Sequence, residues 1–249
     1  MPATPAWPPK SAPRLFVGPM LSAGTNLTIE GPQAHYLSRV MRIGPGGAVI
    51  LCDDQTGEWA ARAAEVGKRD VTLIVEILLR PREQVPDFTL CAALLKKDRF
   101  DLILEKACEL GVRRIQPVLT RRCVADKLNL ERARTVLVEA AEQCARTALP
   151  QIAEPVKLES LLKAWEAERT LFFADENGGA AAAGQFAAHR GPAALLTGPE
   201  GGFDDAERAA VRALPQVCAI TLGPRILRGE TAAIAGTALW MGTVGDWAC

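Results

Sequence analysis

The chain has 249 residues with 29 basic and 29 acidic side chains, so its formal net charge is zero. This balance excludes a bulk polycation, and a hydrophobic content of 49% excludes a largely disordered chain. The seven cysteines are widely spaced and include no C-x-x-C pair, which is typical neither of a disulfide framework nor of a zinc site. They predict reduced thiols and a cytoplasmic protein.

The first thirteen residues are rich in proline and lack both the charged and the apolar segment of a signal peptide. Residues 1–13 are therefore predicted to be a flexible extension. The most apolar late stretch, residues 232–244, is interrupted by glycine and threonine and is shorter than the roughly 20 residues that cross a membrane. We therefore expect no membrane-spanning segment.

Residues 14–80 contain short apolar runs separated by Gly, Pro and Asp, a pattern typical of strands. One exception, residues 35–42, is predicted to form a short helix with Leu37, Val40 and Met41 facing inward. The region therefore predicts a small β-rich domain. A linker is predicted at residues 81–86, where two prolines flank charged residues.

From residue 87 onward, strand-like apolar runs alternate with segments whose apolar residues recur at helical spacing. The first of these helices is predicted to be capped by Asp98 and ended by Gly111. The alternation predicts a parallel sheet covered on both faces, so we assign residues 87–249 to one α/β domain. The other predicted elements are strands at 115–119, 170–174, 193–197 and 217–222 and helices at 130–149, 204–214 and 231–242.

Two turns follow predicted strands, at the edge of an open parallel sheet where ligands bind. The first reads Gly198-Pro-Glu-Gly-Gly202, and its three glycines permit backbone conformations or a close ligand approach that a Cβ would prevent. Taken alone, this turn is better explained as a tight strand-to-helix connection with Asp204 as the helix N-cap.

The second turn, residues 223–231, places Arg225, Arg228 and Glu230 beside the start of a predicted helix. Ile226 and Leu227 lie between the arginines, where a purely solvated loop would not need them. A charged loop with these two apolar side chains in the core would explain this segment by itself. Two such turns at one edge of a sheet favour a ligand site.

The two turns together resemble the ribosomal RNA small subunit methyltransferase E (RsmE) family. The resemblance rests on Leu196-Thr-Gly-Pro-Glu-Gly-Gly-Phe203 and Leu222-Gly-Pro-Arg-Ile-Leu-Arg-Gly-Glu-Thr-Ala232. It extends over residues 14–245 and includes the segments 35–44, 96–101, 105–112 and 139–146. Gly229 departs from the family pattern, which often has a bulkier or polar residue there.

The resemblance implies a PUA-like β-barrel for RNA binding at residues 14–80 and a SPOUT-type methyltransferase domain with a C-terminal trefoil knot at residues 87–249. It also implies transfer of a methyl group from S-adenosylmethionine (SAM) to N3 of a specific uridine in the 16S ribosomal RNA of the small subunit. In a knotted arrangement the two turns become neighbours that hold one adenosine. The implied cofactor-binding residues are Leu196, Thr197, Gly198, Pro199, Glu200, Gly201, Gly202, Leu222, Gly223, Ile226 and Leu227.

The implied chemistry assigns catalytic roles to residues of the two turns. The sulfonium carries its own leaving group, so the protein mainly aligns the methyl carbon with the acceptor nitrogen. The uridine N3 proton must also leave, and negative charge develops on the base. We assign stabilisation of this charge to Arg225 or Arg228 and acceptance of the proton to Glu200 or Glu230. This chemistry requires no metal.

An RNA methyltransferase also needs basic side chains that hold the RNA backbone around an accessible base. Because the net charge is zero, local basic clusters are the candidates, although each cluster by itself is better explained as solvated surface. The resemblance further implies a homodimer with the knot region at the interface. The predicted RNA-binding residues are Arg14, Arg39, Arg42, Lys96, Arg99, Arg121, Arg122 and Arg146.

Three alternatives stand beside this interpretation. A Rossmann-like nucleotide-binding enzyme is disfavoured because the chain lacks the G-x-G-x-x-G pattern. A SPOUT-fold methyltransferase acting on another RNA and a non-catalytic RNA-binding ribosome-assembly factor stay open. The two intact turns favour catalysis, because RNA binding alone requires no pocket for SAM.

Overall fold

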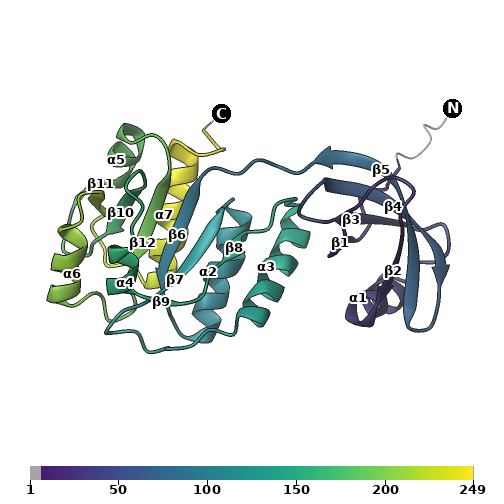
Figure 1. Cartoon of the computed structure of the whole chain (residues 1–249), viewed down its shortest axis with the longest axis horizontal. Coiled ribbons are helices and arrows are strands. Elements are labelled where there is room, and N and C mark those ends of the chain that lie inside the picture. The colour runs from purple at the N-terminus through teal and green to yellow at the C-terminus, as the bar shows by residue number, and fades with distance from the viewer. Residues whose placement is uncertain (1–6, 249) are drawn as a thin grey trace. The chain divides into compact units, whose positions relative to one another are not determined.

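The computed structural model describes residues 7–248, which divide into two compact units (Figure 1). The first unit contains the chain up to Gln84 together with Ala141–Ala148. The second unit contains Val85–Ala140 and the chain from Leu149 onward. The division after Gln84 falls inside the predicted linker, but no sequence pattern indicated that Ala141–Ala148 belongs to the first unit.

Part of the predicted flexible extension is packed against the first unit. The Trp7 ring lies 3.9 Å from the guanidinium carbon of Arg62, and Pro13 is buried. Residues 1–6 of the predicted extension lie outside the described residues.

The first unit is built on a five-stranded sheet with the order β1-β3-β4-β5-β2. β1 pairs with β3 in parallel, and the other pairs are antiparallel. Along β5, Val71, Leu73 and Val75 alternate with exposed or half-buried residues and form the core with Leu37 and Leu51. The strands are β1 (Arg14–Phe16), β2 (Asn26–Glu30), β3 (Ala48–Cys52), β4 (Gly57–Val66) and β5 (Asp70–Pro81).

The helical segment of this unit differs from the prediction. The α-helix α1 (Gly31–His35) continues into a π-helical turn, η1 (Tyr36–Val40). Leu37 is buried as predicted, whereas Val40 is 60% exposed. A π-helix rotates less per residue than an α-helix, so Val40 does not return to the buried face of Leu37.

The second unit contains an eight-stranded sheet with the order β11-β13-β10-β12-β6-β7-β8, and β9 also pairs with β7. All of its described strand pairs are parallel. Every residue of β6 and β12 is buried, so both faces of the sheet are covered there, as predicted. The strands are β6 (Phe88–Ala93), β7 (Arg114–Leu119), β8 (Gln151–Ile152), β9 (Val156–Lys157), β10 (Thr170–Ala174), β11 (Ala180–Ala181), β12 (Ala193–Thr197) and β13 (Val217–Thr221).

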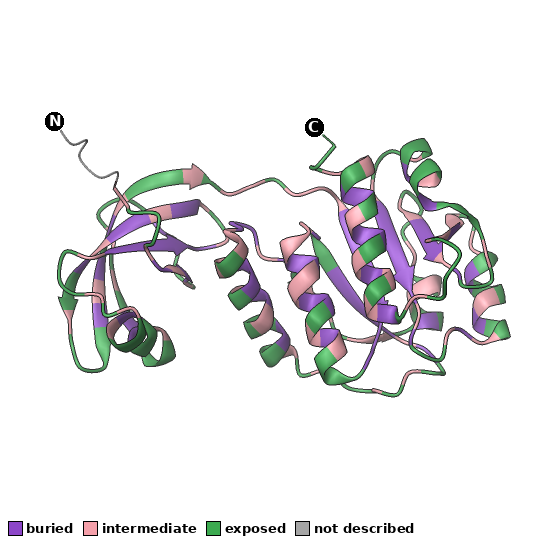
Figure 2. Cartoon of the chain, turned by 180° about the vertical axis from the view of Figure 1, so that it is seen from behind, coloured by how far each residue is buried: buried purple, intermediate pink, exposed green. Residues whose placement is uncertain are grey.

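Helices cover this sheet in two groups. α7 packs on β6 and β12 beside α2 and α5, and the sheet behind it is largely buried (Figure 2). α4 and α6 pack on each other and against β7 and β13. No helix of the described residues is long and apolar enough to cross a membrane. The helices are α2 (Lys97–Glu109), α3 (Leu130–Cys144), α4 (Leu158–Lys163), α5 (Ala182–Ala188), α6 (Asp205–Arg212) and α7 (Gly229–Thr243).

Three helix boundaries correct the predicted ones. α2 begins at Lys97 with Lys96 at its N-cap, so Asp98 lies in the first turn of the helix and is not its cap. The helix predicted at 130–149 ends at Cys144, because Ala145 adopts a left-handed conformation with φ 61°. The last helix begins at Gly229 rather than at residue 231, so the second turn is shorter than predicted. Arg228, predicted as a catalytic residue, therefore occupies the N-cap of α7.

Candidate functional site

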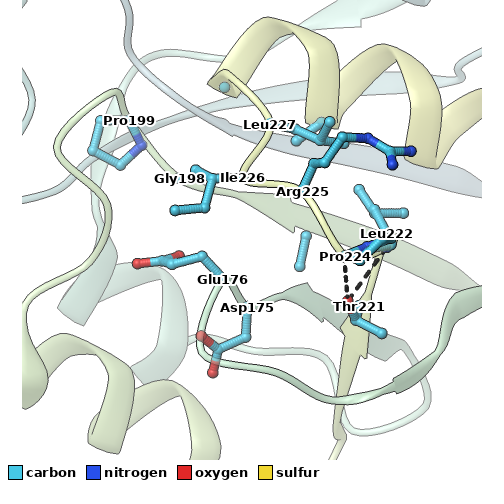
Figure 3. Close-up of a pocket in the computed structure, with 14 residues that line it drawn as sticks. Asp175, Glu176, Gly198, Pro199, Thr221, Leu222, Pro224, Arg225, Ile226 and Leu227 are labelled. Carbon is cyan, nitrogen blue, oxygen red and sulfur yellow. Dashed lines mark hydrogen bonds between the residues drawn. The ribbon is translucent and has the colours of Figure 1, made fainter.

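The carboxyl ends of three adjacent parallel strands, β13, β10 and β12, surround one cavity. The cavity contains about 650 Å³ of empty space, part of it open to solvent. In Figure 3, Asp175 and Glu176 lie on one side of it and Arg225 and Leu227 on another. Its walls are formed by Ala174, Asp175, Glu176, Gly198, Pro199, Thr221, Leu222, Gly223, Pro224, Arg225, Ile226, Leu227, Gly229 and Ala232.

The loop after β12 requires glycine at two positions. A Cβ at position 198 would lie 2.8 Å from the ring of Phe203, which packs edge-on against Phe173. Gly202 has a φ of 65°, and a Cβ there would lie 2.5 Å from Oε1 of Glu176. Any residue other than glycine would therefore distort the loop at both positions.

The same loop ends in a capping box that starts α6. Oδ1 of Asp204 accepts a hydrogen bond of 2.7 Å from the backbone N–H of Glu207, and the Glu207 carboxylate accepts one from the N–H of Asp204. The Glu207 N–H and the nearby guanidinium of Arg121 lower the pKa of Asp204. The Glu207 carboxylate also accepts a hydrogen bond of 2.7 Å from the backbone N–H of Arg121. The loop is therefore fixed at its C-terminal end.

The loop after β13 approaches the glycine-rich loop closely. A Cβ at position 229 would lie 2.7 Å from the carbonyl oxygen of Gly198, so the missing side chain of Gly229 allows the two loops to meet. Ile226 is 89% exposed although it is apolar, and it lines the cavity with Leu222 and Leu227. These three apolar side chains together form an apolar wall that a ligand can cover.

The third wall of the cavity is acidic and was not predicted from the sequence. Asp175 directly follows β10, its side chain is 0% exposed, and it forms ion pairs with Arg208 and with Arg212, the latter at 2.6 Å. Oε1 of Glu176 lies 2.7 Å from Nη2 of Arg208. Burial, together with the charges of Arg212 and Arg122, lowers the pKa of Arg208. The acidic pair directly after the apolar run 170–174 was the available signal, because it ends a strand of the same sheet.

Of the four predicted catalytic residues, only Arg225 is among the residues that line the described cavity. Arg228 is exposed at the start of α7. Arg99 of α2 joins the two predicted proton acceptors: its Nη1 lies 3.2 Å from Oε1 of Glu230, and its Nε lies 3.9 Å from Oε1 of Glu200. Oε2 of Glu230 is buried without a hydrogen-bond partner among the described residues.

Six of the eleven predicted cofactor-binding residues line the cavity. The other five are not among its lining residues: Leu196 and Thr197 are buried within β12, and Glu200, Gly201 and Gly202 follow Pro199 in the glycine-rich loop. The six in the walls are Gly198, Pro199, Leu222, Gly223, Ile226 and Leu227.

The eight predicted RNA-binding residues fall into two classes. Arg39, Arg42 and Lys96 are exposed and have no side-chain partner among the described residues. The other five form contacts within their own unit, and Arg146 is only 4% exposed, so its place is structural. These contacts are Arg14 with Glu58, Arg99 with Glu230, Arg121 with Asp204, Arg122 with the carbonyl oxygen of Gly201, and Arg146 with Glu83.

The described residues contain no group of three or more His, Cys, Asp or Glu side chains arranged to hold a metal ion. The six described cysteines are free thiols. Burial raises the pKa of the Cys91 thiol to about 12, which keeps it protonated.

Comparison with known proteins gives matches over both units. Residues 81–241 match a family described as RNA methyltransferase domain, and residues 29–76 match one described as RNA methyltransferase PUA domain. Proteins named ribosomal RNA small subunit methyltransferase E are similar to this chain. The one from Synechocystis sp. is 31% identical over 88% of this chain and 74% of its own length, and the one from Mycobacterium bovis is 30% identical over 92% and 90%.

Solved structures are similar over nearly the whole chain. The crystal structure of a ribosomal RNA small subunit methyltransferase E from Neisseria gonorrhoeae bound to SAM has a TM-score of 0.86 and 27% identity, covering 95% of this chain and 99% of that one. A putative methyltransferase from Legionella pneumophila in complex with SAM has a TM-score of 0.85 and 26% identity, covering 94% and 99%.

Proposed function

This chain belongs to the ribosomal RNA small subunit methyltransferase E family, and we propose that it transfers a methyl group from SAM to N3 of one uridine in 16S ribosomal RNA. It is a SAM-dependent ribosomal RNA methyltransferase with a PUA-like unit and a parallel α/β unit of the SPOUT type. The observation that carries the proposal is the meeting of two loops, at Gly198 and Gly229, over one cavity at the carboxyl edge of the sheet.

The walls of the cavity fit SAM. Leu222, Ile226 and Leu227 offer apolar side chains to the adenine ring, and the loop at Gly198 allows a close approach of backbone to ligand. We propose that backbone groups of the two loops hold the adenine. When bound, SAM supplies an activated methyl group on a sulfonium.

The chain's own residues must then position the uridine and take up its N3 proton. Arg225 lies in the cavity wall and is exposed, which suits an arginine that stabilises negative charge developing on the base. Arg228, exposed at the N-cap of α7, is the second candidate for this role. For the proton acceptor we propose Glu200 or Glu230, which Arg99 joins beside the glycine-rich loop.

We further propose how the protein meets its substrate. Arg39, Arg42 and Lys96 hold the backbone of the RNA, because their charges are exposed and not engaged by other side chains. We also propose a homodimer with the knot region at the interface; Leu102 of α2 and Leu239 of α7 are exposed apolar side chains on two helices that pack on each other. Light scattering should then give twice the chain mass of 26.7 kDa.

The contact between the loops at Gly198 and Gly229 supports threading of the C-terminal chain through a trefoil knot. We place the protein in the cytoplasm, because small ribosomal subunits are found there.

The test is to incubate the protein with SAM and unmodified small ribosomal subunits, digest the RNA and search for N3-methyluridine by mass spectrometry. We expect this nucleoside with the wild type and strongly reduced amounts with Arg225→Ala. A methyl group on another atom or another RNA would overturn the proposed target while retaining the enzyme class. Binding of SAM without any methyl transfer would favour the ribosome-assembly alternative.

A further inference from the structure

The acidic wall of the cavity contains two carboxylates with different surroundings. The Asp175 side chain is fully buried, and both of its oxygens are engaged by Arg208 and Arg212. Glu176 is the next residue, and its side chain is 32% exposed. Arg208 contacts both carboxylates, so it holds Glu176 beside a fixed anchor.

Glu176 retains unused hydrogen-bond acceptors. Its Oε1 accepts a hydrogen bond of 2.7 Å from Nη2 of Arg208, whereas its Oε2 has no partner among the described side chains. An ionised carboxylate accepts about four hydrogen bonds, so most of its capacity remains open. In Figure 3, Glu176 extends below Gly198 and Ile226, whereas the carboxylate of Asp175 points away from both.

The glycine-rich loop leaves room for this carboxylate. Any side chain at position 202 would begin 2.5 Å from Oε1 of Glu176. Gly202 has a φ of 65°, so both the conformation and the space at this position favour glycine. Arg208 thus holds the Glu176 carboxylate, and Gly202 leaves the space that this carboxylate occupies.

Bound SAM carries hydrogen-bond donors that need such an acceptor. Its ribose is bonded directly to the adenine, so the two ribose hydroxyls enter the cavity with the ring. A carboxylate after a strand of a parallel sheet accepts hydrogen bonds from ribose hydroxyls in dinucleotide-binding folds. Among the described residues of the cavity wall, Glu176 is the carboxylate with an accessible oxygen.

We propose that Glu176, held by Arg208, binds the ribose hydroxyls of SAM. The inference rests on the proposed function, because it requires SAM in this cavity. It makes Glu176 a residue that selects ribose-containing cofactors, a role that neither of the two predicted turns supplies.

The test is calorimetric titration with S-adenosylhomocysteine and with analogues that lack its 2′- or 3′-hydroxyl. We expect the wild type to bind the parent compound on the order of 10- to 100-fold more tightly than at least one analogue, as for hydrogen bonds to a charged group. Glu176→Ala should bind the parent compound more weakly by a similar factor. The same variant should no longer distinguish it from that analogue.

Two further variants and one further analogue make the outcome decisive. Glu176→Gln keeps the size of the side chain and should lose part of the discrimination, whereas Glu159→Gln, an exposed carboxylate on α4, should change nothing. Retained discrimination in a folded Glu176→Ala variant would overturn the inference. If Glu176→Ala instead lost its discrimination against an analogue without the amino group, Glu176 would bind the ammonium group of the ligand and not its ribose, and the inference would be wrong. A wild type that binds no S-adenosylhomocysteine would overturn the proposed function itself.

Discussion

At the scale of single residues, the site depends on positions where the backbone leaves no room for a Cβ. Gly198 faces the Phe203 ring, Gly202 faces Glu176, and Gly229 faces the carbonyl oxygen of Gly198. A buried ring and a backbone carbonyl cannot move cheaply, so Gly198 and Gly229 are needed for close packing of the two loops. At Gly202 the left-handed φ of 65° is what favours glycine.

Gly202→Ala tests this role directly. The added methyl group would force a left-handed backbone conformation on alanine and displace Glu176, so we expect binding of S-adenosylhomocysteine to weaken by about 10-fold, equivalent to ~1.4 kcal/mol. Calorimetry measures the change. Gly184→Ala in α5, where a Cβ would meet nothing within 4 Å, is the matched control and should bind as the wild type does. Unchanged affinity in Gly202→Ala would show that the space between position 202 and the Glu176 carboxylate does not affect binding.

Asp53 in the first unit is the second residue with a measurable role. Burial raises its pKa, but hydrogen bonds from the Thr56 hydroxyl and from the backbone N–H groups of Leu21, Gln55 and Thr56 outweigh burial, so the pKa is lowered from 3.8. A carboxyl whose pKa is lower in the folded state stabilises the fold above its unfolded pKa. This stabilisation is lost as the pH falls through the folded pKa.

We expect Asp53→Asn to reduce the free energy of unfolding by about 1–3 kcal/mol near neutral pH, because several donors lose their charged acceptor. The difference from the wild type should begin to shrink as the pH falls through 3.8, the pKa of the unfolded carboxyl, and should disappear below the lower pKa of the folded state. Urea denaturation followed by circular dichroism, near neutral pH and at a pH below 3.8, measures the free energy of unfolding of both proteins. Glu65→Gln, an exposed carboxyl on β4, is the control. If the stability difference between Asp53→Asn and the wild type did not change with pH, the lowered pKa of Asp53 would not be the source of the stabilisation.

At the scale of elements, the N-terminal ends of three helices lie beside the two loops of the site. α6 begins at the capping box that ends the glycine-rich loop, and α7 begins where the second loop reaches Gly198. Arg99, in the first turn of α2, connects α7 to the glycine-rich loop through Glu230 and Glu200. The three helices therefore fix the two loops relative to each other.

Arg99→Met should disturb this connection without removing the aliphatic stem of the side chain. It leaves the half-buried Glu230 carboxylate without its partner, so we expect the free energy of unfolding to fall by about 1–2 kcal/mol. Binding of S-adenosylhomocysteine should weaken as well. Lys96→Met, three residues earlier and without a side-chain partner among the described residues, is the matched control for loss of charge. Equal stability of the two variants would contradict a stabilising role for the ion pairs of Arg99.

At the scale of the whole molecule, the chain returns to its first unit after α3 begins. Glu142 accepts a hydrogen bond of 2.8 Å from the backbone N–H of Phe16, and Thr147 exchanges backbone and side-chain hydrogen bonds with Glu83. Removing residues 1–80 would therefore expose Ala141–Ala148 as well as delete the PUA-like unit. Point substitutions test RNA binding more cleanly than truncation does.

The double variant Arg39→Gln and Arg42→Gln should weaken binding to small ribosomal subunits and raise KM on the order of 10-fold. The salt dependence of binding should decrease by about one unit of slope per lost phosphate contact. Filter binding at several salt concentrations measures both. Lys68→Gln with Arg69→Gln removes the same charge from the exposed turn between β4 and β5 and should have little effect. Equal losses in the two double variants would indicate attraction by net charge alone.

The sequence by itself determined the local elements and the two turns, because helical spacing, strand runs and glycine-rich turns are encoded by neighbouring residues. It predicted the parallel α/β unit and seven residues of the cavity wall. The tertiary structure alone decided that Asp175 and Glu176 form the third wall, that Arg99 joins Glu200 to Glu230, and that Arg146 is buried. These facts depend on contacts between residues far apart in the chain, which no local pattern contains.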